Sequence, residues 1–448
     1  MALVTPDNTA PIPGSALPWP FRHHALTVGI LAFVITIVWR VLTVSHFTLV
    51  IGALEVALVP LLVAWVVWRI VQRSLANDWR INGFEIYVLL MVLLPLGAAI
   101  GAQREFGQPL IWGIFAFKDY YLLLGVLAVY HWLRMGWISL RQLEQALLIV
   151  AWTCLIYFYL ATLFINPAPY QDTPLAGAND IKGGGVYYRF NMCAMYFGAI
   201  YYSARAFMRE RWIDLLPALL FAAYVVVFRM DRTSMAVTAI GMAGVVLWHA
   251  PWKRLAKVAL VILVPALVAV MVLFLAAPSK VEQYTFMFKD ALHTVTGTEE
   301  GAAEVSVRTL EVAIAKRQVA QHPWIGNGRI SHTWNEGGYE QFLGFFYPAD
   351  VGMLGLVFIY GYPGMLFLYA VFLIAFIYML RVKGRKDDLL FATSRFLLLA
   401  LFLDSLTNGQ LTQNPAQALL MMGLMHHYSR LSPAGREAAP AMPALGTA

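Results

Sequence analysis

Charged side chains are scarce in this sequence. Asp, Glu, Lys and Arg make up 13% of its 448 residues, whereas 60% are hydrophobic and 14% aromatic. A soluble protein carries roughly 25% charged residues, so the composition excludes an ordinary soluble domain and indicates an integral membrane protein. The formal net charge of +7 is interpreted as a topology signal, because basic residues collect in cytoplasmic loops. We expect no nucleic-acid partner.

The sequence also lacks the residues that several chemistries require. Its two cysteines, Cys154 and Cys193, both fall in apolar segments, which excludes a disulfide framework and a thiolate metal site. No Walker, HExxH or DxD motif occurs, so we expect no metal and no cofactor. There is no row of acidic residues within apolar segments and no internal repeat, both of which argue against a coupled transporter. Residues 1–20 do not resemble a signal peptide.

Twelve apolar segments approach the roughly 20 residues that a membrane helix needs. They lie at about 26–44, 47–68, 84–101, 119–135, 143–165, 187–207, 212–228, 233–249, 255–277, 350–380, 389–406 and 413–428. The segment 350–380 is long enough for two helices. We interpret it as one crossing, kinked near Gly361, Pro363 and Gly364, because this keeps the basic cluster at 381–386 inside. The sequence therefore predicts an all-α polytopic membrane protein of about 12 helices with both ends in the cytoplasm.

This topology divides the chain into five parts. A disordered tail at 1–20 precedes nine helices within 21–277, an external loop at 278–349, three helices within 350–430 and a disordered tail at 431–448. The loop includes a predicted helix at 304–321, with Val307, Leu310 and Ile314 on one stripe.

Several arginines lie on the expected outer side, against the positive-inside rule. They are Arg189 in YYRFN, Arg229 and Arg232 in FRMDRTS, and Arg308 at the start of the loop helix. One explanation is snorkelling or local pairing with Asp231 or Glu311. The other is function, because the planar guanidinium fork suits a phosphate. Arg189, Arg232 and Arg308 together form a candidate diphosphate site.

Two residues are candidates for a general base. Asp350 in YPADVGMLG precedes a predicted membrane helix, where it acts either as an N-cap or as a carboxylate that deprotonates a hydroxyl. His332 in the external loop is the second candidate. Secondary candidates for the site as a whole, with no assigned role, are Arg229, Arg104, His322 and Arg329. In the first two helices, Arg40 and Glu55 are expected to form a structural ion pair.

Four local patterns occur in a fixed order along the chain. They are YYRFN with Arg189, the turn DRTS at 231–234, the helix from Arg308 into HPWIGNG, and the helix from Asp350 with its glycine-rich kink. Together they resemble the O-antigen ligase and O-antigen polymerase superfamily over most of the chain. The resemblance implies a GT-C-like membrane glycosyltransferase in the bacterial inner membrane, with an active site that faces the periplasm. Arg189, Arg232 and Arg308 would bind and stabilise the departing diphosphate.

The resemblance also implies the substrates. Such enzymes transfer a glycan from undecaprenyl diphosphate to an acceptor hydroxyl without a metal. Ligases place a histidine before the kinked helix, whereas this chain has Asp350 followed by Val351, a start that looks more like a polymerase. A polymerase of O-antigen, capsule or exopolysaccharide repeat units is therefore favoured. A ligase acting on lipid A-core, with His332 as base, is the alternative, and a transporter of lipid-linked sugars is a third. Expected partners are the glycan donor and acceptor, the bilayer, a chain-length regulator and export proteins.

Overall fold

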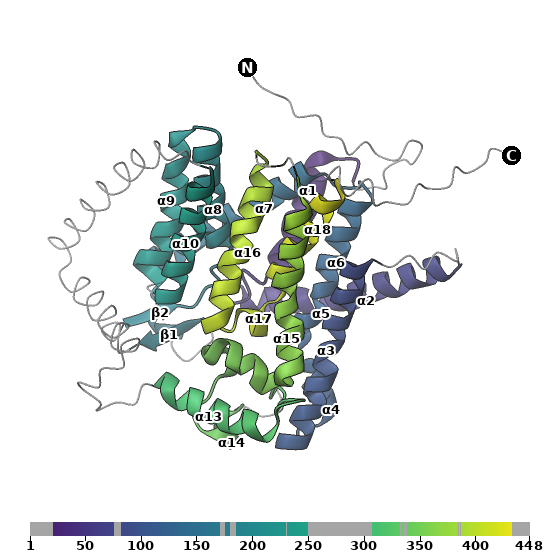
Figure 1. Ribbon diagram of the computed structural model, residues 1–448. Helices are drawn as coiled ribbons and strands as arrows, with labels where there is room; N and C mark the ends of the chain where they lie inside the picture. The colour runs from purple at the N-terminus through teal and green to yellow at the C-terminus, as the bar shows by residue number, and fades with distance from the viewer. Residues whose placement is uncertain are drawn as a thin grey trace.

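The computed structural model describes residues 21–75, 82–170, 175–179, 185–229, 231–249, 307–331, 334, 338–383, 385 and 387–431. Helices dominate these residues (Figure 1). They are α1 (His24–Val38), α2 (Thr48–Leu75), α3 (Gly83–Phe106), α4 (Leu110–Phe115), α5 (Lys118–Tyr121), α6 (Leu123–Arg134), α7 (Leu140–Phe164), α8 (Cys193–Met208), α9 (Leu215–Ala223), α10 (Arg232–His249), α13 (Val307–Gln321), α14 (Glu340–Leu343), α15 (Gly352–Arg381), α16 (Leu389–Thr407), α17 (Gln410–Gln413) and α18 (Ala416–Leu431). The described residues also form the 3₁₀ helices η1 (Ala168–Tyr170), η3 (Trp212–Asp214) and η5 (Pro348–Val351) and the π-helix η4 (Tyr224–Arg229).

The predicted helical membrane protein is confirmed in its broad class. Each expected apolar segment within the described residues contains a helix, and the ninth, 255–277, lies outside them. Among the described helices, six are long and apolar enough to cross a membrane: Thr48–Gln72, Gly83–Phe106, Leu140–Phe164, Trp212–Arg229, Pro348–Arg381 and Leu389–Thr407. The number of crossings and the extent of the external loop stay predictions. The tails at 1–20 and 432–448 also lie outside the described residues.

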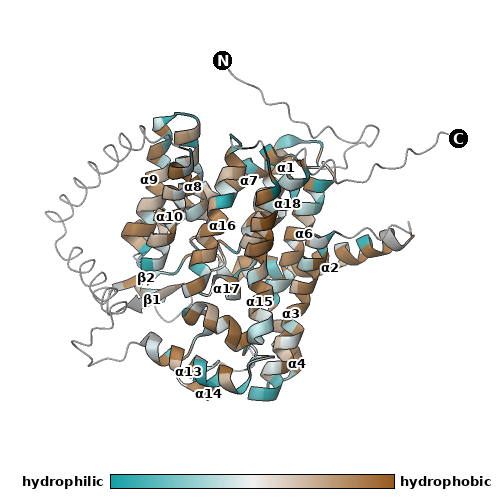
Figure 2. Cartoon of the chain, in the orientation of Figure 1, coloured by the Kyte–Doolittle hydropathy of each residue, from teal (hydrophilic) through white to brown (hydrophobic). Residues whose placement is uncertain are grey.

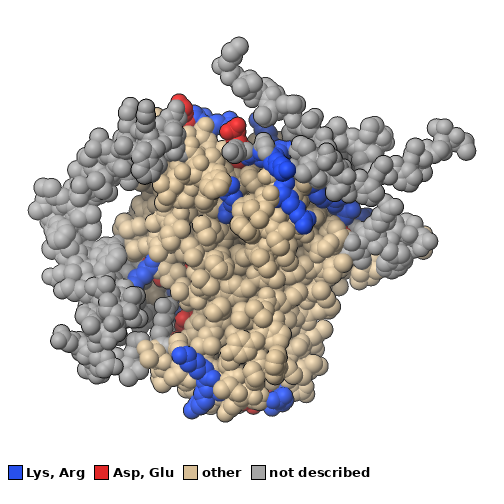
Figure 3. All heavy atoms as spheres, in the orientation of Figure 1, with Lys and Arg blue, Asp and Glu red and all other residues tan. Residues whose placement is uncertain are grey.

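Hydrophobic and charged residues are separated along the bundle. Figure 2 shows hydrophobic residues along the helices and hydrophilic residues near both ends. In Figure 3 the visible face is largely uncharged over its middle, and Lys and Arg gather toward the end where α15 finishes. At the opposite end lie α13 and α14 (Figure 1), and η5 packs against α13. This distribution fits a bundle whose middle is surrounded by lipid.

A two-stranded hairpin is the part of the fold that the sequence did not predict. Strand β1 (Ala176–Asn179) pairs antiparallel with β2 (Gly185–Tyr188), and Ala176 lies opposite Tyr188. The N–H of Arg189 continues the pairing by donating to the carbonyl of Leu175 at 2.9 Å. The helix expected from residue 187 therefore begins later, at Cys193, whose N–H donates to the Asn191 side chain.

The kink expected in the segment 350–380 is confirmed. Helix α15 has non-helical torsion angles at Gly361 (φ 71°, ψ 176°), two residues before Pro363. Proline has no N–H to donate, and the distorted turn releases further backbone groups. The segment 323–328 supplies their partners: the N–H of Asn327 donates to Phe358 O (2.7 Å), and Tyr362 N–H donates to Pro323 O (2.8 Å). The kink and this segment therefore form one hydrogen-bonded unit.

Glycines allow the segment 323–328 to pass between α3 and α15. Gly326 and Gly328 have φ values of +74° and +79°, which residues other than glycine rarely adopt. A Cβ at Gly328 would lie 2.1 Å from the carbonyl oxygen of Ala98 in α3. On the other side, a Cβ at Gly326 would lie 2.6 Å from Ile359 O in α15. The glycines are therefore required by close backbone contact on both sides.

The helix predicted in the external loop is present within the described residues, but its apolar stripe is only partly covered. In this helix, α13, Leu310 is 49% exposed. The buried side chains are instead Glu311, Ala315, Gln318 and Val319. The carboxylate of Glu311 accepts the N–H of Tyr347 at 3.0 Å, just before η5. This long-range bond selects a packing face that the local apolar pattern does not reveal.

Candidate functional site

The hairpin and the start of α10 bring three of the predicted arginines into one region. Arg229 Nη1 donates to the carbonyl oxygen of Tyr188 at 3.1 Å, and its guanidinium lies 5.8 Å from the Tyr187 ring centroid. Arg189 follows Tyr188 directly, and its exposed side chain has no partner among the described residues. Arg232 opens α10, three residues after Arg229. These arginines are called the hairpin arginines below.

A short polar chain fixes the start of α10. Ser234 Oγ donates to Asp231 Oδ2 at 2.6 Å, and the hydroxyl of Tyr196 in α8 donates to Ser234 Oγ at 2.8 Å. The carbonyl of Asp231 also accepts the N–H of Met235. The side chain and the backbone of Asp231 thus hold the first turn of α10, on which Arg232 is carried.

Asp350 lies in η5, where its side chain is exposed. It is not the N-cap of α15, because that position belongs to Val351, which makes no side-chain capping bond. Helix α13 packs against η5 through the bond between Glu311 and Tyr347. Arg308 precedes Glu311 by one helical turn, so its backbone lies on the side of α13 that faces η5. The Arg308 side chain and His332 are outside the described residues.

The end of α16 joins the two groups. On one side, a Cβ at Gly352 would lie 2.4 Å from Leu406 O, so the turn that bears Asp350 packs directly on the backbone of α16. On the other side, Thr407 Oγ1 donates to Thr233 Oγ1, at 3.3 Å, beside Arg232. Asp350 and Arg232 therefore border the same helix end, although they are far apart in the sequence.

The two threonines are residues that the sequence reasoning missed. Thr233 lies within the DRTS turn but was given no role of its own, and Thr407 ends an apolar helix without a local signal. A polar pair lies nearby at the end of α16, where Asn408 Nδ2 donates to Asp404 Oδ1 at 2.8 Å. The residues that follow pack against η5, since a Cβ at Gly409 would lie 2.5 Å from Ala349.

The secondary candidates Arg104 and His322 form a separate cluster. Arg104 Nη2 donates to His322 Nδ1 at 2.6 Å, and His322 Nε2 lies 2.8 Å from Glu105 Oε2. A neutral imidazole with its proton on Nε2 satisfies both contacts. The cluster ties the end of α3 to the residue that follows α13. In the described residues it is not in contact with the hairpin arginines.

Arg329 belongs to a buried network that includes the predicted pair of Arg40 and Glu55. That pair is confirmed, with Arg40 Nε 3.2 Å from Glu55 Oε1. Asp119 extends it, because its Oδ2 lies 2.7 Å from Arg40 Nη1 and 3.5 Å from Arg329 Nη1. The side chain of Asp119 is only 4% exposed. One carboxylate therefore links the α1–α2 connection to the segment after Gly328.

The hairpin is held to the bundle by His46, which lies between α1 and α2. His46 Nδ1 is 2.8 Å from the Tyr157 hydroxyl, and its Nε2 is 3.3 Å from the Tyr188 hydroxyl. Because the backbone N–H of His46 already donates to the Tyr157 oxygen, that hydroxyl donates to Nδ1. Burial lowers the pKa of His46 and raises the pKa of Tyr188 to about 12. Both side chains are therefore neutral at pH 7.

Comparison with known proteins gives one match. The family model described as O-antigen ligase matches residues 217–369. This range runs from α9 into α15 and includes Arg229, Arg232, Arg308 and Asp350. No curated protein matches the chain. The resemblance noted from the sequence motifs is thus confirmed for residues 217–369.

Proposed function

With residues 217–369 matching the O-antigen ligase family, we propose that this protein is a membrane glycosyltransferase acting on lipid-linked glycans. In this proposal it polymerises undecaprenyl-diphosphate-linked repeat units of O-antigen, capsule or exopolysaccharide. It does so at the periplasmic face of the bacterial inner membrane, without a metal or cofactor. A chain-length regulator and export proteins are the partners such a polymerase would need.

The proposed reaction is a substitution at the anomeric carbon of the donor sugar. The acceptor hydroxyl forms a new glycosidic bond to that carbon while the bond to the diphosphate oxygen breaks. The leaving undecaprenyl diphosphate takes the bonding electrons, and the hydroxyl proton passes to Asp350 or His332. Arg189, Arg232 and Arg308 bind the diphosphate, whose charge increases as the bond breaks. Stabilising such developing charge is often the largest contribution to catalysis.

The observation that supports this assignment most is the meeting of two segments at the end of α16. The turn before Gly352 carries an exposed carboxylate, and the turn beside Thr233 carries an arginine that opens α10. The proposed base and the proposed phosphate-binding arginine thus lie on segments that both contact the end of α16. This arrangement suits a substrate with an attacking hydroxyl and a diphosphate leaving group.

A ligase is the second candidate, and the description of the matching family favours it. A ligase would use the same leaving group and the same arginines, but its acceptor would be lipid A-core. The chemistry at the anomeric carbon would be unchanged. The identity of the accumulating intermediate therefore distinguishes the two functions better than any site variant does.

The test uses a deletion strain complemented with the full-length gene. Polyprenyl-linked glycans and surface polysaccharide are extracted and separated by length. Single lipid-linked repeats that accumulate in the deletion strain, without polymer, support a polymerase. Full-length polymer left on undecaprenyl diphosphate means a ligase instead. A deletion strain with unchanged lipid-linked glycans would refute both.

Site variants are then compared with a control variant in α13, the helix that carries Arg308. Arg232→Ala and Arg308→Ala are expected to fail to restore polymer, because loss of one donor to the leaving group typically lowers the rate about 100- to 1,000-fold. Asp350→Ala is expected to fail as well, because loss of a general base typically lowers the rate about 100- to 10,000-fold. Arg317→Ala is the control, since Arg317 is exposed and nine residues, or two and a half turns, beyond Arg308 in α13. Equal restoration by Arg308→Ala and Arg317→Ala would remove Arg308 from the site.

A further inference from the structure

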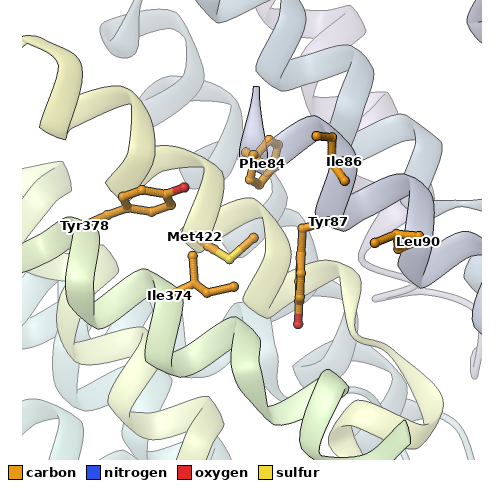
Figure 4. A pocket seen from close by; sticks show the side chains of 8 residues that line it. Phe84, Ile86, Tyr87, Leu90, Ile374, Tyr378 and Met422 are labelled. Carbon is orange, nitrogen blue, oxygen red and sulfur yellow. The ribbon is translucent and has the colours of Figure 1, made fainter. Parts of the chain in front are cut away.

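A basic cavity lies at the end of the bundle opposite to η5. It has a volume of about 400 Å³ and lies between the last turn of α10, the end of α15 and the first turns of α16. Its charged and polar lining is His249, Lys383, Arg385 and Arg395. The hollow in Figure 4, between α3, α15 and α18, differs in kind: it is lined by side chains such as Phe84, Tyr87 and Met422 and has no cationic group.

Arg395 is the unusual member of this lining. It lies two turns inside α16, within the apolar span Leu389–Thr407. Its guanidinium is 4.2 Å from the ring centroid of Trp248 and 4.8 Å from that of Phe396. In the described part of the chain it pairs with no carboxylate, and its buried Nη2 has no hydrogen-bond acceptor.

Ring contacts alone do not balance this charge. A cation within a membrane helix is unfavourable unless it is paired or reaches water. Cation–π contacts offset part of that cost, and they leave the N–H of Nη2 without an acceptor. An anionic oxygen in the cavity would supply both the missing acceptor and the opposite charge.

Asp388, an acidic residue just before α16, already has partners. Asp388 Oδ1 accepts the N–H of Phe391, as the N-cap of α16, and the hydroxyl of Tyr428. Its other oxygen, Oδ2, lies 3.7 Å from Arg385 Nη1. Asp388 and Arg385 are thus paired with each other, and the guanidinium of Arg395 keeps its positive charge beside the cavity.

The rim of the cavity is apolar and open. Trp248 and Leu380, which flank it on α10 and α15, are 61% and 64% exposed. A ligand that enters the cavity past these side chains comes from the acyl region of the bilayer. We propose that this cavity binds the phosphate of an anionic phospholipid headgroup, with the acyl chains along Trp248 and Leu380. Basic pockets between membrane helices are a known mode of anionic lipid binding.

The test is native mass spectrometry of the purified full-length protein. The protein is incubated with phosphatidylglycerol or with phosphatidylcholine of the same acyl chains, and retained lipid is counted. Wild type is expected to retain phosphatidylglycerol preferentially. Arg395→Gln is expected to reduce its retention at least about tenfold, as loss of one charge-assisted hydrogen bond predicts. Arg141→Gln, at an exposed arginine in the first turn of α7, should leave retention unchanged.

Each other outcome is decisive. No lipid preference in wild type, or equal retention by Arg395→Gln, would overturn the site. Full displacement by inorganic phosphate would show that the cavity binds free phosphate and not a lipid. Trp248→Leu, a substitution on the exposed rim, covers the case in which Arg395→Gln does not fold. It removes the ring over the guanidinium and should lower retention about fivefold, and unchanged retention would reject the proposal.

Discussion

The backbone N–H of Gly328 donates to the carbonyl oxygen of Ile359 at 3.1 Å. In an unbroken helix that carbonyl would accept from residue 363, which is a proline. The loop segment thus replaces the hydrogen bond that Pro363 cannot make. Since Gly328 also lies against α3, one residue both completes α15 and joins it to the N-terminal half of the bundle.

Gly328→Ala should therefore destabilise the protein strongly. The new Cβ would require a positive φ and would overlap the backbone of Ala98 and Ala102 in α3. We expect a loss of at least about 3 kcal/mol in the free energy of unfolding, measured in detergent or nanodiscs. Gly107→Ala is the matched control, because Gly107 is in the left-handed region (φ 71°, ψ 14°) but has nothing within 4 Å of its Cβ position. It should cost only about 1–2 kcal/mol, and an equal loss in both variants would show that no steric overlap is involved.

Asp119→Asn should destabilise the buried network of Arg40, Asp119 and Arg329. Removing a buried carboxylate leaves the cations that it pairs without compensation, which typically costs about 3–5 kcal/mol. The measurement is again the free energy of unfolding. Arg211→Ala is the control, because Arg211 is 56% exposed and its partner Asp214 keeps a second pairing with Arg205. It should change stability by less than about 1 kcal/mol, and a comparable effect of the two substitutions would contradict the proposed importance of burial.

Arg232→Lys should impair the proposed transfer reaction while preserving the charge. Lysine cannot donate two parallel hydrogen bonds to a phosphate. We expect the rate of polymer formation in membrane preparations with lipid-linked donor to fall about tenfold or more. Arg317→Lys, on the exposed face of α13, is expected to behave like wild type. Full activity in Arg232→Lys would mean that Arg232 acts only through its charge.

The hairpin should loosen at acidic pH through His46. Burial lowers the pKa of His46 below its usual value near 6.5, so the unfolded state binds the proton more readily. The stabilising contribution of neutral His46 is complete above about pH 6.5 and is lost as the pH falls through the lowered pKa. Protonation of Nδ1 would also remove the acceptor for the Tyr157 hydroxyl.

Hydrogen exchange of the peptide that contains Tyr188 measures this effect. Exchange corrected for intrinsic rates should increase between pH 7 and pH 5 in wild type. In His46→Phe the corrected exchange should be higher at pH 7 and should not depend on pH. An identical pH dependence in both proteins would assign the effect to another group.

The sequence predicted most helices because membrane helices are defined by their own apolar length. The same reasoning located the kink, since Gly361 and Pro363 act on their own helix. It failed where a distant segment decides the structure. Residues 187–188 form a strand because Gly177 and Ala176 pair with them. Glu311 is buried because a backbone N–H 36 residues away needs an acceptor.

The candidate site also contains residues that the sequence revealed and residues that only the structure revealed. Arginines in unusual places, such as Arg232, were recognisable because they contradict the charge distribution of membrane proteins. Their neighbours were not, because Thr233 and Thr407 become relevant only when α10 and α16 meet. Arg395 was not recognised from the sequence, because it lies within the apolar segment of a predicted helix. It stands out only in the structure, where its buried Nη2 has no hydrogen-bond acceptor.

The backbone bonds between α15 and the segment 323–328 have a consequence for biosynthesis. Free carbonyls of a broken helix are costly in hydrocarbon, so α15 cannot reach its final shape alone. The segment that completes it is synthesised earlier, and its other contacts are with α3, which is made earlier still. The kinked helix therefore reaches its final shape only when residues 323–328 lie beside it. Because both α3 and this segment precede α15 in the chain, they are synthesised before the helix that needs them.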